Sequence, residues 1–177
     1  MVGTAVSNKP ERVLQIYNWL KTARLNVLYY EESLRKWAWA VRGHDGVIAF
    51  AGASSPIAFW QHSSEPIYQQ AWFYITLFAG ISAILKPVLR WDKQLVLFSE
   101  LAGHYRTLYI DLKCLCEDMS ATGDLSGKLN SEFEHYRHAF KALDQKEPPQ
   151  DDAKVLKLQA RVNEEININN FWFPPEE

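Results

Sequence analysis

The sequence predicts an all-α protein in which a two-helix transmembrane hairpin lies between an amphipathic N-terminal helix and a cytoplasmic helical bundle or coiled-coil region. Two apolar stretches, at about residues 44–61 and 71–89, are joined by the connection 61–70, which contains no Lys or Arg. Basic residues crowd both outer flanks of this pair. Apolar residues recur at helical spacing in the rest of the chain, which is typical of helices that pack on one face.

The hairpin divides the chain into five segments. We expect a disordered N-terminus, a basic amphipathic helix, the transmembrane hairpin, a cytoplasmic helical region and an aromatic, proline-containing tail, at residues 1–9, 10–42, 43–90, 91–168 and 169–177.

Charge predicts the topology of the hairpin. Short loops rich in Lys and Arg resist translocation, so both termini are expected in the cytoplasm of a multi-pass inner-membrane protein. A membrane helix needs roughly 20 apolar residues, and the first stretch is short for this and contains Pro56. The alternative is a soluble protein in which both apolar helices are buried in the core.

The N-terminal helix is expected to begin at Pro10 and to break at Gly43–Gly46. Residues 1–42 carry seven Lys and Arg against three Asp and Glu, a net charge of +4, and residues 91–177 carry ten against sixteen, a net charge of −6. The basic segment is therefore expected to lie along anionic lipid or against the acidic C-terminal region.

Apolar residues after the hairpin follow a four-three spacing that predicts a long helix over about 91–121, ended near Gly123. A second helix is expected to open with a capping box at Ser131 and Glu134. Asp151 or Asp152 is expected to cap a third helix after Pro148 and Pro149. The residues expected to form the oligomer or bundle seam are Leu95, Phe98, Tyr105, Leu112, Phe133, Tyr136 and Phe140.

Small and polar residues within the two apolar stretches are candidates for helix packing or for lining a pore. These are Gly46, Gly52, Ser54, Ser55, Pro56, Thr76, Gly80 and Ser82. In the tail, the aromatic residues 171–173 are expected to contact either the bundle or the membrane surface.

The sequence contains no phosphate-binding loop, nucleophile elbow or zinc-protease motif. The carboxylate–histidine pairs Glu100–His104 and Glu132–His135 resemble fragments of a bundle di-metal site, but we interpret them as solvated surface. No catalytic, cofactor or metal residue is predicted, and no nucleic-acid partner. Cys114 and Cys116 are expected to have packing roles.

The order of these parts, with the segments HYRTLYIDLKCLCEDM and PPQDDAKVLKLQARVNEEI, resembles the SLATT domain family over roughly residues 12–168. The resemblance implies a two-transmembrane effector of bacterial nucleotide-signalling conflict systems, which defend against phage. Such an effector is expected to oligomerise in lipid and to permeabilise the membrane or form a pore when a cytoplasmic sensor or nucleotide-signalling partner acts. The alternatives are a membrane anchor or scaffold that docks a cytoplasmic partner through its helical bundle, and a soluble helical enzyme with a metal site.

Overall fold

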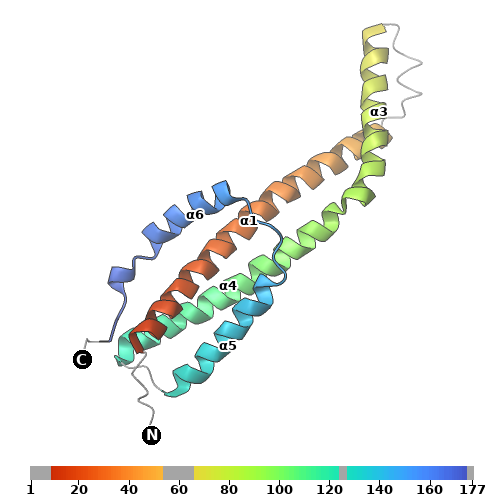
Figure 1. Cartoon of the computed structure of the whole chain (residues 1–177). Coiled ribbons are helices and arrows are strands. Elements are labelled where there is room, and N and C mark those ends of the chain that lie inside the picture. Colours follow the sequence, from red (N-terminus) through yellow and green to blue (C-terminus); the bar gives the residue numbers. More distant parts are fainter. Residues whose placement is uncertain (1–8, 54–65, 124–126, 175–177) are drawn as a thin grey trace. The chain divides into compact units, whose positions relative to one another are not determined.

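A computed structural model of the chain describes residues 9–53, 66–123 and 127–174, and within these ranges it contains helices and their connections but no strand. The helices are α1 (Lys9–Ala53), α3 (Pro66–Leu89), α4 (Trp91–Thr122), α5 (Gly127–Asp144), α6 (Asp152–Glu165) and the 3-10 turn η1 (Ile168–Asn170) (Figure 1). The predicted all-α class is confirmed. Residues 1–8, most of the segment expected to be disordered, lie outside the described residues.

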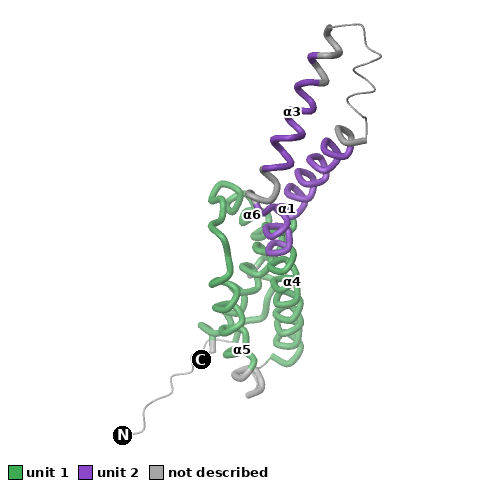
Figure 2. The backbone as a smooth tube through the Cα atoms, turned by 90° about the vertical axis from the view of Figure 1, so that its right-hand side faces the viewer, with its two compact units in different colours: residues 1–31, 99–177 green, residues 32–98 purple. Residues whose placement is uncertain are grey.

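The chain forms two compact units (Figure 2). Unit 1 contains residues 1–31 and 99–177, and unit 2 contains residues 32–98. The helices α1 and α4 are therefore divided between the two units. The helices α5 and α6 belong to unit 1, and α3 belongs to unit 2.

The N-terminal part of α1 is buried in unit 1. The ring of Tyr30 on α1 stacks on the ring of Tyr105 on α4, with 6.0 Å between the ring centroids. Towards α6, Arg24 forms a 2.8 Å ion pair with Glu165. The apolar face of this part of α1 packs on the bundle, and the ion pair joins the basic segment to the acidic C-terminal region, one of the two placements expected for it. Its expected contact with anionic lipid stays a prediction. The buried apolar residues are Val13, Ile16, Tyr17, Leu20, Ala23, Val27, Tyr29 and Tyr30.

The helix α4 buries the apolar row that its spacing predicts. Six residues three or four positions apart are each at most 6% exposed, namely Leu101, Tyr105, Leu108, Leu112, Leu115 and Met119. The helix ends where Gly123 adopts a φ of +62°, a left-handed conformation that glycine accepts without steric cost. There the Gly123 N–H donates to the Met119 carbonyl oxygen at 3.0 Å.

The helices α5 and α6 are only partly as predicted. Because α5 begins at Gly127, Ser131 lies inside the helix and the predicted capping box is wrong. The predicted cap of α6 is confirmed, since the Asp151 carboxylate accepts from the N–H groups of Ala153 and Lys154, at 3.1 and 3.4 Å.

The aromatic tail packs on the bundle, one of the two placements expected for it. The Tyr17 hydroxyl donates to the Trp172 carbonyl oxygen at 2.6 Å. The rings of Phe171 and Phe173 lie 4.6 and 5.2 Å from the Tyr17 ring, measured between centroids. The 155 residues between Tyr17 and Trp172 make this contact one that local sequence patterns do not predict.

In unit 2, one predicted break is wrong. The helix α1 continues through Gly43 and Gly46 to Ala53, because an isolated glycine costs a helix only about 1 kcal/mol. The helix α3 runs through Pro87 to Leu89, and α4 begins after Arg90, whose φ of +48° is uncommon for a residue with a side chain.

The predicted multi-pass location in the inner membrane, with spans at 44–61 and 71–89, is wrong. None of the helices within the described ranges combines the length and the apolarity that a membrane crossing demands. In α1, charged residues continue to Asp45, and residues 54–61 of the first predicted span lie outside the described residues. In α3, the uninterrupted apolar run between Gln70 and Lys86 is shorter than the practical minimum of about 17 residues.

Candidate functional site

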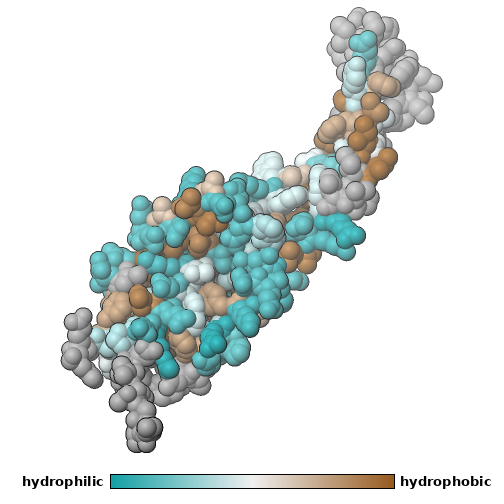
Figure 3. All heavy atoms as spheres, viewed as in Figure 1, coloured by the Kyte–Doolittle hydropathy of each residue, from teal (hydrophilic) through white to brown (hydrophobic). Residues whose placement is uncertain are grey.

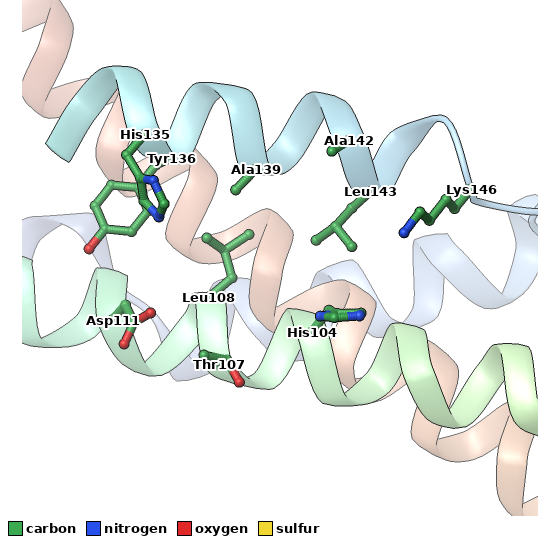
Figure 4. A pocket seen from close by; sticks show the side chains of 10 residues that line it. All are labelled: His104, Thr107, Leu108, Asp111, His135, Tyr136, Ala139, Ala142, Leu143 and Lys146. Carbon is green, nitrogen blue, oxygen red and sulfur yellow. The ribbon is translucent and has the colours of Figure 1, made fainter. Parts of the chain in front are cut away.

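A groove of about 320 Å³ lies between α4 and α5 in unit 1 (Figure 4). We name it the α4–α5 groove. It is lined by His104, Thr107, Leu108, Asp111, His135, Tyr136, Ala139, Ala142, Leu143 and Lys146.

Helical spacing explains which residues reach the groove. From α4, His104, Leu108 and Asp111 are three or four positions apart and so share one face. Figure 4 shows His104 opposite Leu143 and Lys146 at one end, and Asp111 opposite His135 and Tyr136 at the other. The groove thus has polar groups at both ends and an apolar middle.

The phenol of Tyr136 lies at the Asp111 end of this groove. Burial raises the pKa of Tyr136 to about 12, and the negative charge of Asp111 adds to this effect. The hydroxyl therefore remains protonated at neutral pH and is able to donate a hydrogen bond.

Two exposed histidines that we interpreted as solvated surface lie at opposite ends of the same groove. His104 and His135 both line it, whereas their sequence partners Glu100 and Glu132 do not. In the described ranges there is no group of three or more His, Cys, Asp or Glu side chains arranged to hold a metal ion. Helical spacing alone did not reveal the shared groove, because it fixes the face of a helix but not the register between two helices.

A partly buried polar cluster, missed by sequence reasoning, lies at the connection between α5 and α6. We name it the Glu147 cluster, and its members are Asn26, Tyr30, Tyr105, Glu147 and Gln150. The Glu147 carboxylate accepts hydrogen bonds from the Tyr105 hydroxyl, from Asn26 Nδ2 at 3.1 Å and from Gln150 Nε2 at 3.0 Å. The Gln150 amide also reaches Asn26 Oδ1 at 3.3 Å and the Tyr30 hydroxyl at 3.2 Å.

Burial dominates the electrostatics of the Glu147 cluster. It raises the pKa of the Glu147 carboxyl, while hydrogen bonds from Tyr105 and Tyr30 act in the opposite direction. The nearby carboxylate of Asp144 raises the pKa of Glu147 further. The cluster thus holds a half-buried carboxylate among neutral donors.

The residues predicted for helix packing or a pore have varied surroundings. Gly46 and Gly80 are exposed, and a Cβ atom at either would meet nothing within 4 Å. Thr76 is exposed, whereas Ser82 is buried and its carbonyl oxygen accepts from His44 Nε2 at 3.1 Å. Gly52 lies near the end of α1. Three further candidates, Ser54, Ser55 and Pro56, lie outside the described residues, so a pore lining stays a prediction.

Most of the residues predicted for the seam are buried within one chain. Tyr105, Leu112, Phe133 and Tyr136 belong to unit 1, and Phe98 to unit 2, and all five are at most 9% exposed. Leu95 and Phe140 are half-buried. An interface between copies would therefore use another surface.

Such a surface is present on α3 (Figure 3). Six large side chains of this helix are between 48 and 71% exposed, and we name them the α3 apolar face: Phe73, Tyr74, Leu77, Phe78, Ile81 and Ile84. Among the α3 residues whose burial the structure describes, the buried ones, Ala79 and Ser82, are small.

The described fold defines an all-α protein that contains a helical bundle. Comparison with known proteins finds no family model, no curated protein and no solved structure that matches the chain. The resemblance to the SLATT family therefore stays a prediction.

Proposed function

We propose that this protein is a non-catalytic helical effector module that acts by self-assembly, with the α3 apolar face as the contact between copies. The observation that supports this proposal is the exposure of six large apolar side chains between Phe73 and Ile84. Contiguous apolar patches of this kind mark interaction sites on proteins.

The six side chains share one side of the helix. At 100° per residue they fall within an arc of about 140°. Ala79 and Ser82, which are buried, lie outside this arc. The exposed residues therefore form a single continuous surface rather than scattered positions.

The size and charge of the α3 apolar face suit a second copy of the chain. Aromatic side chains bury about 150–250 Å² each, so the three aromatic members, at about half exposed or more, present on the order of 300 Å². The three aliphatic members add to this area. A standard interface buries about 800 Å² per partner. Residues 66–85 contain no Asp, Glu, Lys or Arg, so two copies meet face to face without repulsion between like charges.

Assembly is the step that the predicted effector role requires. A sensor or nucleotide-signalling partner, as the SLATT resemblance implies, would act by promoting or releasing this association. A scaffold, the alternative role, would remain monomeric and dock its partner through the bundle.

Sedimentation velocity of the full chain over a range of concentrations tests the proposal. We expect the wild type to self-associate and Phe78→Glu to be monomeric, because a charge within the face has no partner in the interface. The matched control is Leu156→Glu, at a residue of α6 that is 66% exposed and lies outside the face. A wild type that is monomeric at every concentration, or equal loss of association in the two variants, would contradict the proposal.

A vesicle-leakage assay separates the permeabilising effector from an assembly without this activity. Dye release by the wild type, lost in Phe78→Glu and retained in Leu156→Glu, would support a permeabilising effector that depends on the α3 apolar face. Self-association without dye release would support assembly alone.

A further inference from the structure

A second cavity of unit 1, about 480 Å³, lies beside the Glu147 cluster. It is separate in its lining from the α4–α5 groove and from the α3 apolar face, and nothing in the proposed self-assembly uses it. Its volume lies within the range of about 300–1,000 Å³ that is usual for small-molecule sites.

Aromatic rings form one wall of this cavity. Trp19 from α1 stacks on Phe140 from α5, with 5.7 Å between ring centroids and 28° between planes. Tyr105 from α4 lies 6.3 Å from Phe140, again between centroids. The faces of aromatic rings carry negative partial charge, and Trp attracts cations most strongly.

The charge in the lining is net negative. Glu147 and Asp144 contribute two carboxylates, and Lys141 contributes one ammonium group. The Glu147 carboxylate receives its hydrogen bonds from the neutral groups of Tyr105, Asn26 and Gln150. No ion pair involving Glu147 is found among the described residues, so its negative charge is left without a direct cationic partner.

We infer that this cavity binds an organic cation, a ligand that carries an ammonium group on a small apolar or aromatic body. The ammonium group would lie beside the Glu147 carboxylate, and the body would lie against the Trp19 and Phe140 rings. Aromatic rings next to a carboxylate are the environment in which proteins recognise alkylated ammonium groups.

Calorimetric titration of the full chain with benzyltrimethylammonium tests this inference. Benzyl alcohol serves as the neutral probe and benzoate as the anionic probe. We expect saturable binding of the cation, at least about tenfold weaker binding of the other two probes, and at least about tenfold weaker binding of the cation to Glu147→Gln. The control is Glu134→Gln, which removes an exposed carboxylate of α5 that pairs with Arg137.

A second variant guards against misfolding of Glu147→Gln. Phe140→Leu removes an aromatic wall at a half-buried position and is expected to weaken binding of the cation severalfold with the circular dichroism spectrum unchanged. No binding of the cation at millimolar concentration, equal binding of benzoate, or wild-type affinity in both Phe140→Leu and folded Glu147→Gln would overturn the inference.

Discussion

The helices α3 and α4 both carry a stripe of apolar residues, but the two stripes have different surroundings. On α4 the row from Leu101 to Met119 is at most 6% exposed, because α1 and α5 supply apolar and aromatic partners. On α3 the face from Phe73 to Ile84 is about half exposed or more. An apolar stripe in a sequence therefore shows that a face needs a partner, but not whether the same chain provides it.

The largest expected effect tests this contrast with one substitution in each helix. Leu112→Ala removes a fully buried side chain of α4 and is expected to lower the free energy of unfolding by about 2–5 kcal/mol. Leu77→Ala is the matched change on α3, where the side chain is 48% exposed, and should cost less than about 1 kcal/mol. Urea unfolding at a concentration at which the protein is monomeric measures both values.

Equal destabilisation by the two changes would contradict the contrast. It would mean that the α3 apolar face contributes to the folded chain as much as the α4 row does. Self-association has to be kept out of this measurement, because binding between copies stabilises the folded state by mass action.

The next largest effect concerns the stability that the N-terminal cap gives to α6. Asp151→Ala removes the carboxylate that caps α6 and is expected to cost about 1 kcal/mol, within the range of about 0.5–2 kcal/mol for such caps. Asp152→Ala is the control, since it removes only a favourable charge in the first turn, worth about 0.3–1 kcal/mol. Thermal unfolding followed by circular dichroism compares the two, and a larger effect of the control would show that the cap bonds contribute little.

Periodicity predicted those parts of the fold that depend on one helix at a time. The buried row of α4, its end at Gly123 and the cap at Asp151 all follow from spacing and capping chemistry within a single helix and its ends. The break expected at Gly43–Gly46 failed because glycine weakens a helix without ending it.

Periodicity and capping patterns did not predict the contacts between segments that are far apart in the sequence. The shared groove of His104 and His135 depends on the register between α4 and α5. The cluster around Glu147 depends on Asn26, which is 121 residues away in the sequence. The prediction of a membrane hairpin was wrong for a different reason. Apolar runs and basic flanks are typical of membrane segments, but they do not show that a helix is long and apolar enough to cross a membrane.

The smallest expected effect is a pH dependence that should arise in unit 1 and not in α3. The raised pKa of Glu147 means that the native state holds a proton more firmly than the unfolded chain does. Its contribution to stability is therefore fully present below the ordinary pKa of Glu, about 4.3, and is lost as the pH rises through the raised native value.

The groups that face this carboxylate are Tyr30 from α1, Tyr105 from α4, and Asp144 from α5. The helix α3 contains no Asp or Glu, so it adds no carboxylate titration of its own.

We expect the wild type to gain stability relative to Glu147→Gln as the pH falls from about 7 to 5, because only the wild type takes up a proton at this position. The effect should be smaller than that of the core substitution, since the carboxylate is half-buried and hydrogen bonds from neighbouring side chains offset part of the cost of burial. Urea unfolding at several pH values measures this difference, with Glu134→Gln as the control at an exposed carboxylate of α5. If the difference for Glu147→Gln did not change with pH, or if the wild type lost stability relative to it towards pH 5, burial would not control this carboxylate. The contrast between a bundle that encloses its polar and apolar groups and a helix that exposes its apolar groups would then rest on packing alone.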